Sequence, residues 1–244
     1  MGSLAQEKAF LRGVELWRLG LYREARLEFE TLRLSVAQDP VRSYQLARFL
    51  LQLGNYRSAI LAARQVLELA NMSDAETMGA PKFFNHLRFG TYYSDLVMPI
   101  AKEYGFHPLF LFSLLRQESL FESFVGSTAG ARGLMQIMPA TGADLANKLG
   151  WPPDYSDADL YRPLVSIRLG TEYLAKQREK FNGDFYAALA AYNAGPGNAE
   201  QWKAMAPDDP DLFLEMIRYV ETRKYIRGIY EVFNIYRLLY DRTP

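Results

Sequence analysis

The N-terminal part of the chain repeats itself with a period of 34 residues. A shift by this period superimposes five pairs of residues: Trp17 with Leu51, Leu19 with Leu53, Gly20 with Gly54, Tyr22 with Tyr56 and Ala25 with Ala59. The period is typical of stacked helix-turn-helix units, in which Gly and Tyr mark the turn and a small Ala lies where two helices touch. We therefore expect helices at about 5–18, 22–36, 41–53 and 56–70.

The alternative is that these residue pairs match by chance, because any antiparallel helical hairpin favours Gly at its turn and Ala where its helices touch. Two units are also fewer than the three or so that usually form a free-standing stack. We expect these tetratricopeptide-like hairpins to pack against neighbouring structure or to continue upstream, and to serve as a scaffold.

The periodic pattern lapses between Asn71 and Pro81, where loop and turn residues collect. We place the domain boundary here, with residues 1–78 as the helical-repeat region and residues 79–244 as a second domain. Further helical segments are expected at about 90–104, 108–121, 139–149, 163–181, 184–192, 211–217 and 221–240, without a convincing alternating strand. The sequence thus predicts an all-α chain.

Composition removes several classes of function. Lys plus Arg and Asp plus Glu both number 28, so no net field attracts nucleic acid or an anionic membrane surface. The chain has no cysteine and only two histidines, His86 and His107, which argues against a disulfide framework and a zinc site. We expect no metal, no cofactor and no nucleic-acid partner.

Glu118 is the first candidate for chemistry. It lies on a predicted helix that begins at Pro108, and Leu111, Leu114 and Leu115 share its face. Partial desolvation there raises the pKa of a carboxylic acid, which allows it to donate a proton near neutral pH. The alternative is a buried structural glutamate paired with Arg116 or Arg132.

Two loops carry further polar groups. Residues 126–136 are rich in small side chains, which expose backbone groups to a polar ligand such as a sugar, with Ser127 and Gln136 adding side-chain donors and acceptors. Residues 190–197 end a helix in a turn that presents Tyr192 beside Asn193. The alternative for this turn is a Gly-Pro turn with a packed tyrosine beneath it.

These motifs, in their order and spacing, closely resemble those of the soluble lytic transglycosylase family. The four elements are Glu118-Ser119, Gly133-Leu134-Met135-Gln136, Ala191-Tyr192-Asn193 and Glu221-Thr222-Arg223-Lys224-Tyr225. The resemblance covers about residues 90 to 240. It implies a superhelix of helical hairpins before a mostly helical, lysozyme-like catalytic domain that cleaves the β-1,4 bond between N-acetylmuramic acid and N-acetylglucosamine in peptidoglycan.

The resemblance also implies roles for individual residues. Glu118 would be the acid and base, and Tyr192 would hydrogen-bond near it to orient it. The residues that would contact substrate are Ser127, Met135, Gln136, Asn193 and Glu221. Met135 would form a wall of the cleft, and Asn193 would bind an N-acetyl sugar. A structural pairing of Glu221 with Arg223 or Arg218 is the alternative for that residue.

The sequence departs from the family pattern at Glu122 and Ser123, where members commonly have Asn or Asp followed by Pro. Glu122 lies one turn from Glu118 and would raise its pKa further by like-charge repulsion. A row of residues on the last helix, which includes Tyr225, follows helical spacing, and we assign this row to core packing.

Met1–Gln6 lacks the basic and apolar regions of a signal peptide. The substrate instead indicates the periplasm or cell envelope, with a leader absent and envelope proteins as further partners of the repeats. Two rivals stay open: a hydrolytic muramidase related to goose-type lysozyme, which needs a second carboxylate, and a non-catalytic peptidoglycan-binding module.

Overall fold

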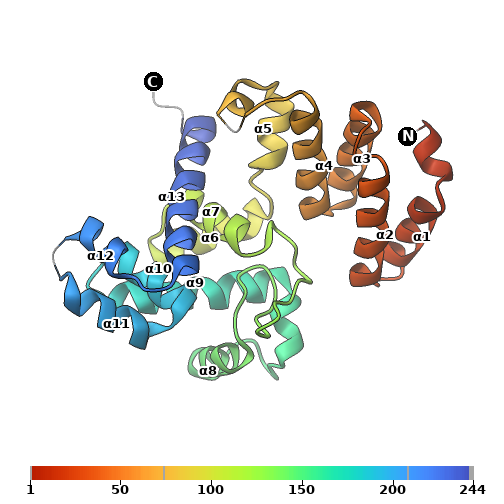
Figure 1. Cartoon of the computed structure of the whole chain (residues 1–244). Coiled ribbons are helices and arrows are strands. Elements are labelled where there is room, and N and C mark those ends of the chain that lie inside the picture. The colour runs from red at the N-terminus through yellow and green to blue at the C-terminus, as the bar shows by residue number, and fades with distance from the viewer. Residues whose placement is uncertain (1, 74, 208, 242–244) are drawn as a thin grey trace. The chain divides into compact units, whose positions relative to one another are not determined.

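The computed structural model describes residues 2–73, 75–207 and 209–241 (Figure 1). The chain forms two compact units. The first contains the residues up to Tyr92 together with Ser119–Val125, and the second contains Tyr93–Glu118 and the residues from Gly126 onward. Helices dominate both units, and the extended structure in the described ranges consists of isolated bridges in the 126–137 loop. The all-α prediction is confirmed.

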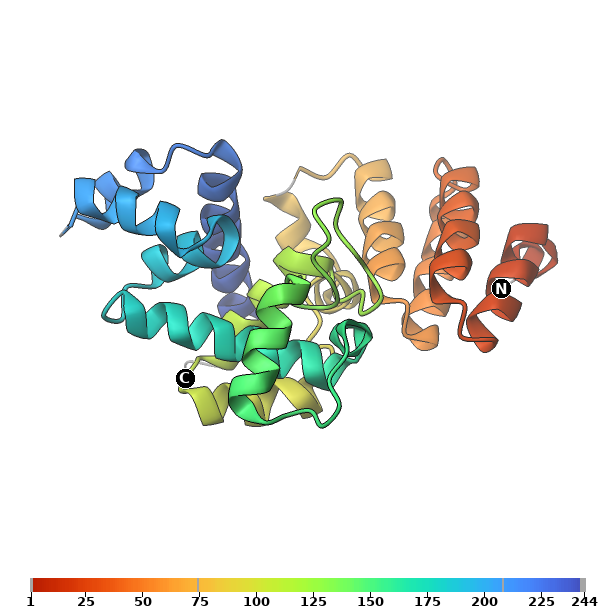
Figure 2. The same ribbon diagram turned by 90° about the horizontal axis from the view of Figure 1, so that it is seen from below.

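The first unit is built from two helical hairpins at the predicted positions. Its helices are α1 (Lys8–Arg18), α2 (Tyr22–Ser35), α3 (Pro40–Leu53) and α4 (Tyr56–Leu69). Figures 1 and 2 show these four helices side by side. Gly20 and Gly54 take equivalent left-handed conformations at the two turns, with φ of 76° and 83°, and the matching Ala25 and Ala59 are fully buried. The 34-residue repeat is therefore structural.

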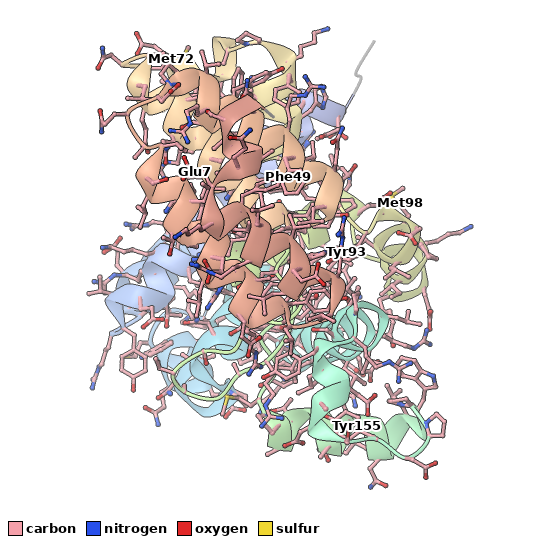
Figure 3. The ribbon with its side chains drawn as sticks, turned by 90° about the vertical axis from the view of Figure 1, so that its right-hand side faces the viewer. Glu7, Phe49, Met72, Tyr93, Met98 and Tyr155 are labelled. Atoms are coloured by element: carbon pink, nitrogen blue, oxygen red, sulfur yellow. The ribbon has the colours of Figure 1, made fainter. Side chains whose placement is uncertain are left out.

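Aromatic side chains fill the interior of the hairpins. Phe49, labelled in Figure 3, has its ring centroid 4.7 Å from that of Phe10 and 6.3 Å from that of Phe29. A further helix, α5 (Lys82–Arg88), packs against α4, and its Phe83 and Phe84 contact Tyr44 of α3. Helix α5 was not predicted; it is short and lies between the loop expected at residues 71–81 and the helix expected from about residue 90. The expected domain boundary at 78/79 lies inside this first unit.

The second unit surrounds one apolar helix. Its helices are α6 (Ser94–Tyr104), α7 (Pro108–Ser119), α8 (Pro139–Leu149), α9 (Pro163–Lys180), α10 (Phe185–Ala194), α11 (Pro196–Met205), α12 (Pro210–Met216) and α13 (Val220–Tyr240). Leu111, Phe112, Leu114 and Leu115 of α7 are each at most 1% exposed. The ring of Phe112 lies 6.0 Å from that of Tyr236, which places α7 against α13. The apolar stripe thus carries α7 into the core, as predicted.

The start of α7 is capped by the side chain of His107. Nδ1 of His107 accepts a hydrogen bond from the backbone N–H of Leu109, at 3.2 Å. A neutral imidazole can serve as such an acceptor, so His107 satisfies one of the open amides at this helix end.

Helix α10 is buried on every side. Ala187, Ala188, Leu189, Ala190 and Ala191 have no exposed surface, because small side chains let α9, α11 and α13 approach closely. One residue, Gly195, separates α10 from α11, and Pro196 starts the new helix, a position that suits its fixed φ. The Gly-Pro pattern predicted a turn at this point, and α11 was not expected. Within the described ranges, none of the helices is both long and apolar enough to span a membrane.

Candidate active site

Glu118 lies on the floor of a pocket of about 850 Å³ in the second unit. The pocket is lined by Gln117, Glu118, Ser127, Thr128, Ala129, Ala131, Gln136, Met138, Tyr192, Asn193, Val220, Glu221, Lys224 and Tyr225. All four predicted motifs and the loop at Ser127 therefore converge on one cavity, in which Glu118 and Tyr225 are 107 residues apart in the chain. Its size is in the range of ligand-binding sites.

The carboxyl group of Glu118 is held in a protonation state suited to an acid. Burial at the end of the leucine stripe raises its pKa to about 8, and a hydrogen bond from Tyr225 opposes that shift. Arg132, considered from the sequence as a partner of Glu118, forms an ion pair with Asp157 at 3.6 Å. At neutral pH the side chain is therefore mainly a neutral carboxylic acid.

Two tyrosines frame this acid. The hydroxyl of Tyr225 donates a hydrogen bond to Oε1 of Glu118, and the hydroxyl of Tyr192 donates to the backbone carbonyl of Met135 at 2.7 Å. Burial and the nearby Glu118 raise the pKa of both phenols well above the usual value. Both groups therefore stay protonated and act as hydrogen-bond donors.

The small-residue loop folds back on itself beside Glu118. Gly126 and Ile137 each form a β-bridge with Arg132, and Oγ of Ser127 accepts a hydrogen bond from the amide of Ala131 at 3.0 Å. Gly133 has a φ of 75°, and a Cβ there would lie 1.8 Å from the carbonyl oxygen of Leu160. No side chain fits at this position, so the loop can approach the core closely only with glycine.

Gln136 and Asn193 reach the pocket with their amides already oriented. Nε2 of Gln136 donates to the carbonyl of Gly133 at 2.8 Å. Oδ1 of Asn193 accepts a hydrogen bond from the hydroxyl of Thr222 at 2.7 Å. Asn193 is exposed, and this bond fixes the orientation of its amide group. Fixed amides of this kind suit the recognition of hydroxyl and acetamido groups.

Met135 and Glu221 differ in their placement. Met135, expected as a wall of the cleft, is fully buried and packs against Gly170, while its carbonyl receives the Tyr192 bond. It lies behind the pocket and supports it from there. Glu221 is exposed and lines the pocket. Arg223, which was considered as a pairing partner of Glu221, donates a hydrogen bond to the backbone carbonyl of Ile217.

Two further carboxylates, Glu122 and Asp144, pair with basic side chains and are not among the residues that line this pocket. Oε2 of Glu122 accepts a hydrogen bond from Arg26 at 3.0 Å within the first unit, and Glu122 does not contribute to the pKa shift of Glu118. The expected like-charge repulsion is therefore wrong, because Arg26 compensates the carboxylate. Asp144 pairs with Lys148 at 2.7 Å beside a different hollow.

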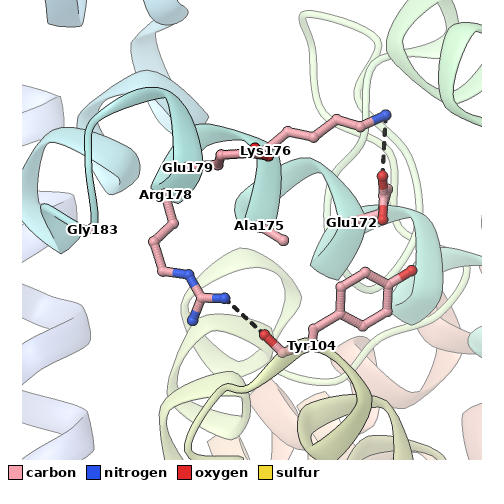
Figure 4. Close-up of a pocket in the computed structure, with 7 residues that line it drawn as sticks. All are labelled: Tyr104, Glu172, Ala175, Lys176, Arg178, Glu179 and Gly183. Carbon is pink, nitrogen blue, oxygen red and sulfur yellow. Dashed lines mark hydrogen bonds and ion pairs between the residues drawn. The ribbon is translucent and has the colours of Figure 1, made fainter.

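A second hollow of the same unit lies between α6 and α9 (Figure 4). Lys176 pairs there with Glu172 at 3.1 Å, and Nη2 of Arg178 donates to the carbonyl of Tyr104 at 2.8 Å. Both cationic groups thus bind neighbouring parts of the protein. The bond from Arg178 links α9 to the end of α6.

Fold and site together define a lysozyme-like helical domain with one protonated acid in a polar pocket. Residues 95–211 match the model of the transglycosylase SLT domain. The chain belongs, through this domain, to the family of soluble lytic transglycosylases. The resemblance inferred from the four motifs is confirmed.

Known relatives agree with this assignment. The chain is 33% identical over 162 residues to the soluble lytic murein transglycosylase of Salmonella typhimurium and 32% identical over 169 residues to that of Escherichia coli K12. These alignments cover 65% and 68% of this chain but 25% and 26% of the relatives. The chain thus spans about a quarter of the length of these proteins.

Solved structures match almost the whole chain. The 70 kDa soluble lytic transglycosylase of Escherichia coli gives a TM-score of 0.81 at 28% identity, over 98% of this chain and 36% of that one. An inactive mutant of the lytic transglycosylase Slt from Pseudomonas aeruginosa gives 0.77 at 29% identity, over 99% of this chain and 37% of the other. The match includes the helical hairpins as well as the catalytic-type domain.

Tyr225 contacts Glu118 in the pocket, although the sequence pattern indicated only core packing for it. Its place in the core row was correct, since only 6% of it is exposed. Helical spacing identifies the buried face of α13, but it does not show which group across the core receives the hydroxyl. The fourth motif, which ends at Tyr225, was the signal that could have assigned it.

Proposed function

We propose that this protein is a lytic transglycosylase that cleaves the β-1,4 bond between N-acetylmuramic acid and N-acetylglucosamine. The observation that carries the proposal is Glu118, a buried acid with a pKa of about 8, at the floor of a pocket lined by Ser127, Gln136 and Asn193. The motif matches and the SLT-domain relatives support the same activity. Glycan strands of peptidoglycan are the proposed substrate.

The arrangement suggests how one carboxyl group performs both proton transfers. Tyr225 remains protonated and donates to Oε1, so the acid proton resides on Oε2. Glu118 first gives this proton to the glycosidic oxygen as the bond to C1 breaks. The resulting carboxylate then takes the proton of the sugar's own C6 hydroxyl as that oxygen closes on C1.

An intramolecular hydroxyl competes well with water because its effective concentration is high when the ring is suitably held. The product is then a 1,6-anhydromuramic acid end, and no water is consumed. The N-acetyl group of the substrate would stabilise the positive charge between the two steps. The fixed amide of Asn193 is suited to hold that group.

Tyr192 has a supporting role in this proposal. Its hydroxyl ties α10 to the carbonyl of Met135 and so fixes the loop that presents Gln136. Ser127, Gln136, Asn193 and Glu221 would contact the glycan. Action on peptidoglycan places the protein in the periplasm or cell envelope, and the helical hairpins offer a surface for envelope proteins.

A hydrolytic muramidase is the second candidate, and the position of Glu221 is the observation that favours it. Inverting and retaining hydrolases use two carboxylates, one of which activates water or attacks the sugar. Glu221 is the second carboxylate among the residues that line the pocket, but its side chain is exposed.

Digestion of purified peptidoglycan, followed by mass spectrometry of the fragments, separates the candidates. A lytic transglycosylase gives anhydro ends, which are lighter by one water than the ends made by a hydrolase. Binding without any fragments would identify a non-catalytic module and would contradict the proposal.

A further inference from the structure

The seven residues Ser119–Val125 follow Glu118 directly in the chain, yet they pack as part of the first compact unit. The residues on both sides of this segment belong to the second unit and line its pocket, with Glu118 before it and Ser127 after it. The segment is therefore the covalent link between the acid and the small-residue loop. Its conformation is set by contacts with the helical hairpins.

The first of these contacts is aromatic. Phe121 is 1% exposed, and its ring lies edge-on to that of Tyr92 at 5.1 Å. The ring of Tyr92 stacks on Tyr56 of α4 at 4.0 Å. Phe121 is thus attached to the second hairpin.

The second contact is a buried ion pair. Nη1 of Arg26, on α2, donates to Oε2 of Glu122 at 3.0 Å, and the glutamate side chain is only 1% exposed. Burial raises the pKa of Glu122, and Arg26 and Arg57 oppose this effect. In the part of the chain that the structure describes, Oε1 of Glu122 has no hydrogen-bond partner. Loss of Arg26 would thus strand a buried carboxylate, which is strongly unfavourable.

The third contact holds the far end of the segment. The ring of Phe124 lies 6.0 Å from that of Trp17 and 5.7 Å from that of Tyr22. Nε of Arg23 donates to the carbonyl of Phe124 at 3.2 Å. Residues from both helices of the first hairpin therefore fix this end.

The backbone between Glu118 and these contacts needs such support. Leu120 and Phe121 have φ angles of 49° and 64°, in the left-handed region that residues with bulky side chains rarely adopt. Two successive residues in this region persist only where the surroundings determine them. The chain leaves α7 through this turn, one residue after Glu118.

We propose that Arg26 is a positioning residue for Glu118. By holding Glu122, it keeps the exit turn of α7 in its left-handed form and so fixes the carboxyl group relative to the loop at Ser127. The expected effect on glycan turnover rests on the proposed function. It gives the helical hairpins a direct part in the chemistry.

The test compares Arg26→Met with Arg12→Met in the full-length chain. Arg12 pairs with Glu28 at 2.7 Å on the same hairpin and is not one of the residues named above that hold the segment, so its replacement controls for a general weakening of the unit. Hydrogen–deuterium exchange of the peptide that spans 119–125 is measured first. Turnover of a soluble glycan is measured next, with kcat and KM determined separately.

We expect Arg26→Met to speed exchange in 119–125 at least about fivefold and to lower kcat about tenfold, with KM changed less than about twofold, since small misplacements of a catalytic group mainly affect turnover. Arg26→Lys keeps the charge and should restore most of both losses. Arg12→Met should match the parent.

Equal exchange and equal kcat in Arg26→Met and Arg12→Met would overturn the inference. If circular dichroism shows that Arg26→Met does not fold, Phe124→Leu replaces it, with the same expected and contradicting results. If the parent protein cleaves no glycan, the proposed function fails, while the exchange comparison still decides whether Arg26 holds the segment.

Discussion

The hydroxyl of Tyr225, on α13, donates a hydrogen bond to Oε1 of Glu118, near the end of α7. The two residues are 107 positions apart in the chain. Because the phenol donates and keeps its own proton, it stabilises the carboxylate form of Glu118. Burial has the larger and opposite effect, and the balance leaves the pKa of Glu118 at about 8.

Replacement of Tyr225 by Phe tests this balance. Without the donor, the carboxylate form loses a stabilising bond, so the pKa of Glu118 rises above about 8. The alkaline limb of the pH–rate profile, where the acid form is lost, should move to higher pH. A limb that stays in place or moves down would show that Tyr225 does not act on Glu118. Turnover should also fall, since the carboxyl group is less firmly oriented.

Tyr192→Phe serves as a matched comparison, because it also removes one hydroxyl from the same pocket. Its bond goes to the Met135 carbonyl, so turnover should fall about tenfold while the alkaline limb stays near that of the parent. An unchanged rate would assign Tyr192 a packing role only.

Glu118→Gln should abolish cleavage, with a loss of at least about 100-fold, while the fold and glycan binding remain. The amide keeps the shape of the side chain but cannot exchange the proton. Activity within about tenfold of the parent would remove Glu118 from the acid role. Glycan binding by the inactive variant, measured by calorimetry, is the control.

The same variant should change how stability depends on pH. The pKa of Glu118 is about 8 in the folded protein and about 4.5 when unfolded, so the folded state holds the extra proton between these values. The stability that the protonated Glu118 contributes is fully present below pH 4.5 and is lost as the pH rises towards 8. Glu118→Gln should therefore melt higher than the parent at pH 8, with a smaller difference at pH 4. Parallel melting curves across this range would contradict the raised pKa.

Much of this fold follows from hydrophobic spacing. The 34-residue period predicted both hairpins, and the leucines of α7 predicted the burial of Glu118. Helix α11 was missed because Gly-Pro usually marks a turn, whereas here a single glycine separates two helices. The packing of 119–125 with the hairpins depends on side chains from distant helices, such as Arg26 and Trp17, and no local pattern encodes such a contact.

Removal of residues 1–78 tests how far the second domain acts alone. The fragment keeps every residue that lines the pocket, so it should still cleave short soluble glycans. It loses Arg26, Trp17 and Tyr22, which hold 119–125, so its kcat should be lower than that of the full chain. A fragment that folds and turns over at the full rate would show that the hairpins are dispensable for the chemistry.

Glu221→Gln tests the hydrolytic alternative. If Glu118 acts alone, this variant should keep activity within about tenfold of the parent and release the same products, since an exposed pocket residue affects substrate binding more than proton transfer. A loss comparable to that of Glu118→Gln would identify Glu221 as a second catalytic carboxylate.

In the proposed mechanism, Glu118 directs the sugar's own hydroxyl, and not water, to the broken bond. Digestion of peptidoglycan in water enriched in oxygen-18, with mass spectrometry of the new muramic acid ends, tests it most directly. We expect anhydro ends that lack one water and carry no label. Reducing ends that contain oxygen-18 would contradict the account and identify the protein as a hydrolase.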